Sequence, residues 1–434
     1  MRRGACCAAL LLCLQAAVPA AQAEDYSFDV GQFEKKAFDW GGYGELKWED
    51  FDLNHSGAGY QLNYFDRTSR NRLSRLTATV EMEGRWQRDP LSFNFRVHSA
   101  ASHDAVARSD LTRLYEGYLG YAPRTGLRFE LGKRALRWGK GYAWSPVGFL
   151  ERPKDPNDPD LSREGFVLGS AEWVRTGVGP FQTLSLSAYA VPVRSDINGN
   201  FGSANHLNGA FKVYALYRDT DIDLMYLSKG SRSARLGLDF SRNLRTNLEV
   251  HGEWAHVFDQ PQSVLSGSSG QLARRVSDVD SYLLGMRYLT EGDTTWIVEY
   301  YRNGGGYTRD QMHAFYDLVD NGLAAYQSGA DRTLLDRAQT AADKGYLKPN
   351  AMRDYLYVRA SKKEPFDILY FTPALTVIAN LDDHSWTLTP EVVYTRYKNL
   401  ELRGRLTLLH GGAGTEFGEK QNDSKLELRV RYFF

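Results

Sequence analysis

The sequence predicts an all-β fold: a transmembrane, antiparallel, up-and-down β-barrel of about 18 strands with one long, partly helical outer loop. Three observations lead to this fold. Apolar and polar residues alternate along many segments of roughly ten residues, Tyr and Trp recur near the segment ends, and short connections alternate with long ones. A soluble β-sandwich also alternates, yet it requires neither the length of a tilted membrane-spanning strand nor aromatic ends. We therefore prefer the membrane barrel.

Composition excludes several other classes of protein. The 434 residues carry 53 basic and 53 acidic side chains, a formal net charge of +0, so no basic field points to a nucleic-acid partner. Mean hydropathy is −0.47, and no segment approaches the roughly 18 consecutive apolar residues that a transmembrane helix requires. Insertion into a membrane would therefore have to use strands.

The first 23 residues are typical of a secretory signal: two arginines, a short apolar run and the small-residue site "AQA" before Glu24. The 3 cysteines all lie in this segment, so the exported chain would form neither disulfides nor thiolate metal sites. We expect residues 1–23 to be the signal, 24–41 a short periplasmic segment and 42–434 the barrel.

Period-two alternation, which indicates a strand with one apolar face, recurs along the chain. A single alternating segment is a weak indication, and repetition makes it strong. The clearest examples are "LTATVEMEGRW" (76–86), "LSFNFRVH" (91–98), "LEVHGEWAHV" (248–257), "LELRGRLTL" (400–408) and "KLELRVRYFF" (425–434).

The connections between these segments sort into two sets, as the two ends of a membrane barrel require. Short turns are expected at one end, near 87–90, 122–126, 177–180, 218–221, 242–246 and 291–294. Long links are expected at the other end, near 54–72, 100–110, 138–165, 192–209, 257–279, 304–353 and 410–424, with 230–232 and 380–383 as short outer loops. The count is even at about 18 strands, and fusing two segments within 353–380 would give about 16.

The last residues resemble the C-terminal signal of bacterial outer-membrane proteins. Phe434 ends the sequence, Tyr432 lies two residues earlier, and Val430, Leu428 and Leu426 continue the alternation backwards. The resemblance implies delivery to the barrel insertion machinery and a final location in the cell outer membrane, in contact with its lipids. Tyr432 and Phe434 are the predicted assembly signal.

The stretch 131–165 begins with a strand and ends in a long loop rich in Pro and Asp. Between them lies "WGKG" (138–141), in which a glycine stands on each side of Lys140. The stretch 131–165 resembles a motif of several monomeric outer-membrane channel families, including alginate-export-type porins. The glycines let the backbone bend, and so long a loop can fold into the lumen as a constriction. Oxygen ligands for Ca²⁺ are an alternative role for its acids, Glu164 included, but their spacing favours a solvated loop without a metal. The candidate constriction residues are Trp138, Lys140, Asp155, Asp158 and Asp160.

The longest link, 304–353, shows apolar residues at helical spacing after Thr308, a suitable N-cap. A helical loop of this kind can act as a lid or plug inside the barrel. It can also pack its apolar face against the barrel rim, which is the arrangement we prefer.

Charged residues on the polar faces are the main functional indication, because charges that line a barrel set its selectivity. By alternation, two neighbouring closing strands direct four arginines inward, which makes an anion-attracting patch: Arg403, Arg405, Arg429 and Arg431. The plainer interpretation is that such charges form ion pairs along the inner wall.

Catalysis finds no support in local motifs, because neither GxSxG nor HExxH occurs. No cofactor is expected. The preferred function is an outer-membrane channel for passive passage of small polar solutes, with anions as candidates. The alternatives are an export channel for an anionic polysaccharide or related secreted product, and a closed barrel that acts as a scaffold.

Overall fold

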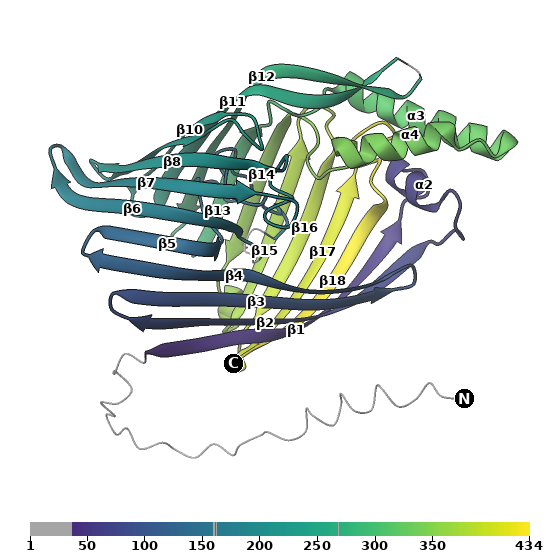
Figure 1. Ribbon diagram of the computed structural model, residues 1–434. Coiled ribbons are helices and arrows are strands. Elements are labelled where there is room, and N and C mark those ends of the chain that lie inside the picture. The colour runs from purple at the N-terminus through teal and green to yellow at the C-terminus, as the bar shows by residue number, and fades with distance from the viewer. Residues whose placement is uncertain (1–36, 159–160, 162, 268) are drawn as a thin grey trace. The chain divides into compact units, whose positions relative to one another are not determined.

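The computed structural model describes residues 37–158, 161, 163–267 and 269–434, and the predicted signal segment lies outside them. Eighteen strands form one sheet that closes into a barrel (Figure 1). The strands are β1 (Phe38–Leu53), β2 (Arg72–Arg88), β3 (Leu91–Asp104), β4 (Arg108–Arg124), β5 (Leu127–Arg134), β6 (Phe166–Val178), β7 (Phe181–Val193), β8 (His206–Tyr217), β9 (Thr220–Leu227), β10 (Arg235–Arg245), β11 (Leu248–Ser266), β12 (Gln271–Leu289), β13 (Thr294–Arg302), β14 (Asp354–Lys362), β15 (Phe371–Asn380), β16 (Trp386–Tyr394), β17 (Leu400–His410) and β18 (Asn422–Phe433).

Each strand pairs antiparallel with the next strand in the sequence, and β1 pairs with β18 to close the ring. Glu45 lies opposite Arg431 in this closing pair. Just beyond it, the amide N–H of Phe434 donates to the carbonyl oxygen of Gly42 at 3.0 Å. Closure leaves no unpaired strand edge, which is the condition for a sheet to cross lipid. The predicted count of 18 is confirmed, because β14 and β15 form as separate strands.

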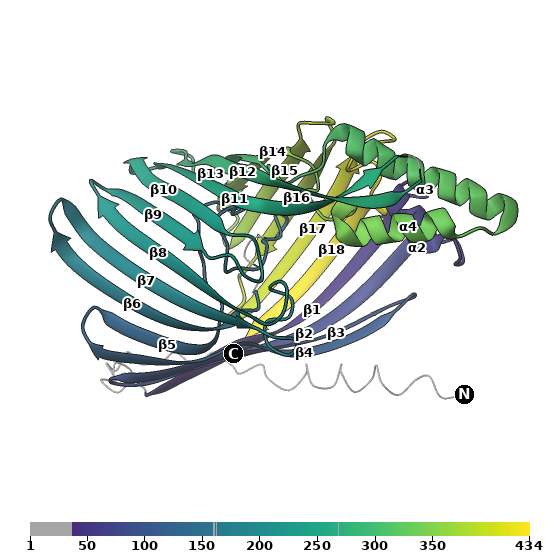
Figure 2. The same cartoon turned by 45° about the horizontal axis from the view of Figure 1, so that its top comes forward.

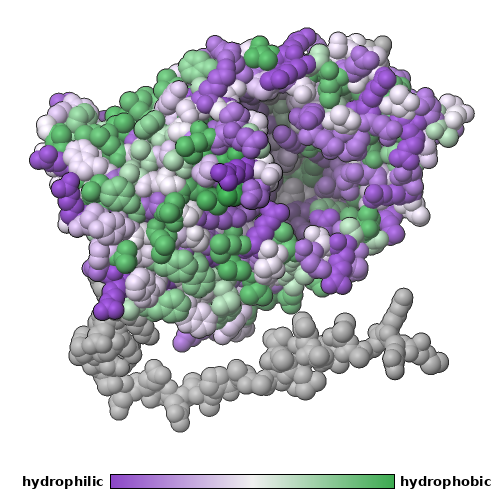
Figure 3. All heavy atoms as spheres, viewed as in Figure 1, coloured by the Kyte–Doolittle hydropathy of each residue, from purple (hydrophilic) through white to green (hydrophobic). Residues whose placement is uncertain are grey.

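The alternation in the sequence separates the two faces of the barrel wall. On β18, Leu428 and Val430 are 50% and 46% exposed on the outer face, whereas Glu427 and Arg429 are 2% and 5% exposed on the inner face. In a space-filling view, apolar residues gather over the strands and hydrophilic residues over the end that carries the helices (Figure 3). An apolar outer face suits a bilayer, because burying it in lipid removes apolar area from water.

One end of the barrel carries short turns, and the longest of them spans only residues 363–370. The other end carries the long connections, including 54–71, 135–165 and 303–353. The predicted alternation of connections is therefore present. The first residue of β1 and the last of β18 both lie at the short-turn end, as an even strand number requires.

Three predicted boundaries differ from the structure. The links 100–110 and 257–279 are extended hairpins, joined only by 105–107 and 267–270. In the second hairpin Pro261 lies opposite Val276, within the paired strands. The barrel also begins at Phe38 rather than at residue 42, because the backbone already pairs with β2 there.

Helices occupy the end with the long connections (Figure 2). The hydroxyl of Thr308 accepts the amide N–H of Gln311, which makes Thr308 the N-cap that was predicted. None of the helices in the described residues is long and apolar enough to cross a membrane. The helical elements are α2 (Ala58–Tyr64), α3 (Arg309–Gly329), α4 (Thr333–Ala341) and the π-turn η2 (Ala342–Tyr346), with a 3₁₀ turn η3 (Pro365–Asp367) at the opposite end.

The apolar stripe of α3 packs on neighbouring outer segments. Met312, Phe315 and Val319 are buried in one cluster with Ala58 of α2 and Leu283 of β12. Figure 2 shows α2, α3 and α4 gathered beside the strand ends. The same cluster also contains Trp144 of the connection 135–165 and the buried Tyr355 and Tyr357 of β14, so the choice between rim packing and a plug stays a prediction.

Candidate functional site

The connection 135–165 between β5 and β6, hereafter the internal loop, crosses the lumen from one wall to the other. It contacts inward-facing residues of β9, β10, β11 and β13 on one side. It contacts β17 and β18 on the other side. Strands β9 and β18 are nine places apart in a ring of eighteen, so they lie on opposite sides of the barrel.

At the first wall, backbone amides of the internal loop donate to buried wall carboxylates. The N–H groups of Lys140 and Gly141 each lie 2.6 Å from one oxygen of Glu253. The N–H of Ala143 lies 2.9 Å from Glu299, which is fully buried. Hydrogen bonds to a charged acceptor are stronger than neutral ones, so this contact holds the loop firmly.

The glycines of "WGKG" make this contact sterically possible. Gly139 has φ +84°, which side-chain-bearing residues rarely adopt. A Cβ added there would also collide with the side chains of Ser145 and Glu253. The glycine thus lets the backbone approach the carboxylate, as the sequence motif suggested.

Lys140, a predicted constriction residue, adds an ion pair at the same wall. Its Nζ lies 3.0 Å from Asp223 of β9 and 3.8 Å from Asp239 of β10. Burial by itself would lower the pKa of Lys140, but the two carboxylates outweigh burial and raise the pKa. Lys140 therefore stays charged and neutralises part of the acidic wall.

At the opposite wall the internal loop presents a carboxylate, Asp158, to arginines. Asp158 lies 2.9 Å from Arg429, and 3.8 and 3.9 Å from Arg403 and Arg405. The side chain of Asp158 is 10% exposed. A predicted constriction residue and three predicted pore-lining arginines thus meet in one place.

The four predicted arginines, hereafter the arginine cluster, face inward together, but each has an acidic partner. Because β17 and β18 pair in register, Arg403 lies directly opposite Arg429. Whether the cluster attracts anions stays a prediction, since these partners offset much of its charge. The ion pairs are Arg403 with Glu401 at 3.1 Å, Arg405 with Glu391 at 2.5 Å, Arg429 with Glu427 at 2.8 Å, and Arg431 with Glu45 at 2.6 Å.

The remaining candidate residues of the internal loop have different surroundings. Trp138 is 2% exposed and packs edge-on against Phe149 and Tyr189, so it anchors the loop in an apolar cluster. Asp155 is exposed and accepts the amide N–H of Asn157 at 2.9 Å. Asp160 lies outside the described residues. Among the described residues, no group of three potential ligands could hold a metal ion.

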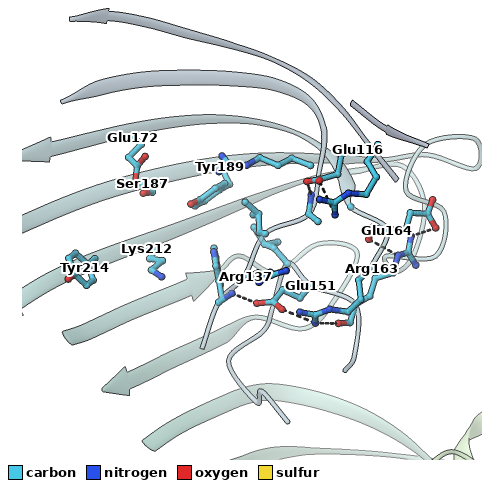
Figure 4. Close-up of a pocket in the computed structure, with 18 of the residues that line it drawn as sticks. Glu116, Arg137, Glu151, Arg163, Glu164, Glu172, Ser187, Tyr189, Lys212 and Tyr214 are labelled. Carbon is cyan, nitrogen blue, oxygen red and sulfur yellow. Dashed lines mark hydrogen bonds and ion pairs between the residues drawn. The ribbon is translucent and has the colours of Figure 1, made fainter. Parts of the chain in front are cut away.

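The internal loop narrows the lumen without filling it. A cavity of about 490 Å³ lies between the loop and strands β6, β7 and β8 (Figure 4). A second cavity of about 420 Å³ lies on the side of Tyr142 and Lys154. The two share part of their lining, namely Arg137, Trp138, Glu151, Leu161 and Arg163.

Arg137 lines both cavities, and sequence reasoning did not single it out. Its side chain is exposed to the lumen and makes no hydrogen bond or ion pair with any described residue. Nothing in local spacing separates a paired arginine from an unpaired one, so the sequence carried no signal for it. A guanidinium without an acidic partner attracts an anionic group, so Arg137 is a candidate for such attraction in this lumen.

Glu151 lies beside Arg137 and links two other parts of the internal loop, at Trp138 and Arg163. It accepts the amide N–H of Trp138 and pairs with Arg163 at 3.0 Å. Burial nevertheless raises the pKa of Glu151 above its ordinary value. The charge of this carboxyl is therefore sensitive to mild acid.

No protein-family model matches the sequence, and no curated protein matches it. Solved barrels are similar in fold. OccK11 (OpdR) of Pseudomonas aeruginosa has a TM-score of 0.50 and 12% sequence identity, over 91% of this chain and 95% of that protein. A triple mutant of the Rhodopseudomonas blastica porin has a TM-score of 0.45 and 10% identity, over 92% of this chain and 100% of that protein. At such identity the likeness to OccK11 supports the fold alone.

The fold is that of an outer-membrane β-barrel. The closed ring of strands, the apolar outer face and the short turns gathered at one end all belong to that class. This architecture places the protein in the outer membrane, because its strands leave no unpaired edge and present an apolar outer face to lipid. The internal loop and its cavities are then placed inside a membrane-spanning wall.

Proposed function

We propose that this outer-membrane barrel is a channel that lets small polar solutes cross passively. The observation that carries the proposal is the internal loop, which crosses the lumen between two anchored walls and leaves polar cavities beside it. A lumen narrowed by a fixed loop selects solutes by size and by charge. We propose no catalytic role for the charged groups that line it.

Solutes with an anionic group are the preferred class. Arg137 lines both cavities and has neither an ion pair nor a hydrogen bond with any described residue, whereas the arginines of the arginine cluster are paired with carboxylates. The internal loop counts against export of an anionic polysaccharide, because a polymer would need the loop to leave the lumen. A closed scaffold differs from a channel in having no conductance.

The proposal also includes assembly partners. Tyr432 and Phe434 are 53% and 47% exposed, beside the seam where β18 meets β1. We propose that the barrel insertion machinery recognises these aromatic side chains, and that outer-membrane lipids surround them afterwards. Phe434→Ala should lower the yield of folded barrel in the outer membrane several-fold, and an unchanged yield would argue against this role.

Planar-bilayer recording of the purified protein tests the channel. We expect an open conductance with a preference for chloride over potassium, measured as the reversal potential in a salt gradient. Arg137→Gln should reduce this preference more than Arg403→Gln, because Arg403 is already paired with Glu401. A folded barrel that stays silent would refute the proposed function.

A further inference from the structure

The cavity of about 490 Å³ has two chemically different sides (Figure 4). Arg137, Glu151 and Arg163 belong to the internal loop on one side. Glu172 and Ser187 belong to the strand wall on the other. Pockets of this size commonly hold small ligands, with a few polar groups that set the orientation.

Most charged groups that line this cavity already have a partner of opposite charge. Such pairs attract a solute weakly, because their fields cancel at short range. The pairs are Arg163 with Glu151 at 3.0 Å, Arg152 with Glu164 at 3.3 Å, Lys212 with Asp223 at 3.2 Å, and Arg96 with Glu116 at 3.3 Å.

Two lining groups of opposite sign have no ion pair with any described residue. One is the guanidinium of Arg137, on the internal loop. The other is the carboxylate of Glu172 on β6, whose one hydrogen bond among the described residues comes from the hydroxyl of Ser185 at 3.2 Å. The two come from opposite sides of the cavity (Figure 4) and do not pair with each other.

We propose that this cavity binds a small zwitterionic solute, such as an amino acid or a short peptide, with its carboxylate at Arg137 and its ammonium group at Glu172. The proposal rests on the proposed channel function and names its substrate class. Arg137 would attract a simple anion, but Glu172 would repel it. Glu172 would attract a simple cation, but Arg137 would repel it. Only a solute with both charges satisfies both groups.

The lining beside Glu172 suits a peptide unit between the two charged ends. Ser187 and Tyr189 of β7 supply hydroxyl groups there, and Ser187 is 7% exposed. Hydroxyls both donate and accept, so they can bind either the N–H or the carbonyl of an amide. A dipeptide therefore fits the chemistry of the cavity at least as well as a single amino acid.

The test compares four solutes of similar size, each with an internal peptide bond, that differ in charge. They are diglycine (zwitterion), N-acetylglycine (anion), glycylglycinamide (cation) and N-acetylglycinamide (neutral). Uptake of each labelled solute into proteoliposomes is measured for the wild type, Arg137→Gln, Glu172→Gln and the double variant. Lys229→Gln, on an exposed outer loop, is the matched control for a lost charge.

We expect diglycine to enter the wild-type vesicles about threefold to tenfold faster than the other three solutes. Arg137→Gln should slow the uptake of diglycine and N-acetylglycine but speed that of glycylglycinamide. Glu172→Gln should slow the uptake of diglycine and glycylglycinamide but speed that of N-acetylglycine. In the double variant the four rates should converge, and Lys229→Gln should leave all of them unchanged.

The outcomes separate this inference from the channel itself. Equal uptake of all four solutes by an open, conducting wild-type barrel would overturn the zwitterion site and leave the channel standing. Absence of any conductance would instead refute the channel. Calorimetric titration of diglycine into the detergent-solubilised wild type adds a readout without transport, and no binding there would also overturn the site. Arg137→Lys, which keeps the charge, should restore the uptake order if Arg137→Gln folds poorly.

Discussion

The internal loop is held in opposite ways at the two walls that it touches. At β11 and β13 the wall supplies carboxylates, Glu253 and Glu299, and the loop supplies backbone N–H groups. At β17 and β18 the wall supplies arginines, and the loop supplies the carboxylate of Asp158. An acidic wall and a basic wall are thus bridged by one segment that complements both.

The two anchors of the internal loop differ in whether mutation can replace the groups that form them. Backbone amides cannot be substituted, and they reach Glu253 only because Gly139 and Gly141 leave room. The side chain of Asp158 can be substituted, and the arginines it touches keep Glu391 and Glu427 as partners. The first anchor should therefore contribute more to the position of the loop than the second.

Removing the first anchor should have the largest effect. Glu253→Ala leaves the N–H groups of Lys140 and Gly141 unpaired, at a cost of about 2–4 kcal/mol in the free energy of unfolding. The loop should then leave the lumen part of the time. Single-channel recording should show a larger and noisier conductance, and urea unfolding should show the loss of stability.

Glu49→Ala is the matched control for this variant. Glu49 is also a buried wall carboxylate, at 6% exposure, but it pairs with Lys47 and Lys425 of the wall. Its loss should leave conductance noise unchanged. Equal noise in the two variants would contradict a special role for Glu253.

Removing the second anchor should have a smaller effect on stability and a clear effect on selectivity. Asp158→Asn should cost about 1–2 kcal/mol, because Arg429 keeps Glu427. The arginine cluster would lose one acidic partner, so the reversal potential should shift toward chloride. Asp155→Asn, which changes an exposed acid of the same loop, is the control and should shift the reversal potential less. An equal shift in the two variants would mean that Asp158 does not screen the arginine cluster.

The smallest effect should be a change of selectivity with pH. Above its raised pKa, Glu151 carries a negative charge, and below it the carboxyl is neutral, so the lumen gains one positive charge as pH falls. Chloride preference should therefore rise at mildly acidic pH, where ordinary carboxyl groups are still ionised. In the wild type the reversal potential should change in a step across this pH range. The step should be absent in Glu151→Gln.

Glu164 provides the contrast for the pH experiment. Burial would raise its pKa, but the hydrogen bond from Lys133 and the charges of Arg152 and Lys133 outweigh burial and lower the pKa. Glu164→Gln should thus leave the step in place. A step that survives in Glu151→Gln and vanishes in Glu164→Gln would reverse our assignment.

The candidate site was only partly predictable. Alternation placed Arg403 and Arg429 on the inner face, and pairing of consecutive strands brought them together. The long link 138–165 was predicted from its glycines and its length. Asp158 meets Arg429 across 271 positions of sequence, and no local pattern specifies that contact. For the same reason Arg137 and Glu172 could not be identified as unpaired.

The barrel could be predicted from the sequence, because the side-chain period of a strand directs alternate residues to lipid and to the lumen, whatever the distant contacts are. The same period predicted which arginines face inward. The ion pairing of each charge could not be predicted, because it depends on the path of the internal loop across the lumen. The loop joins walls nine strands apart, and along its path Arg137 and Glu172 have no ion pair with any described residue.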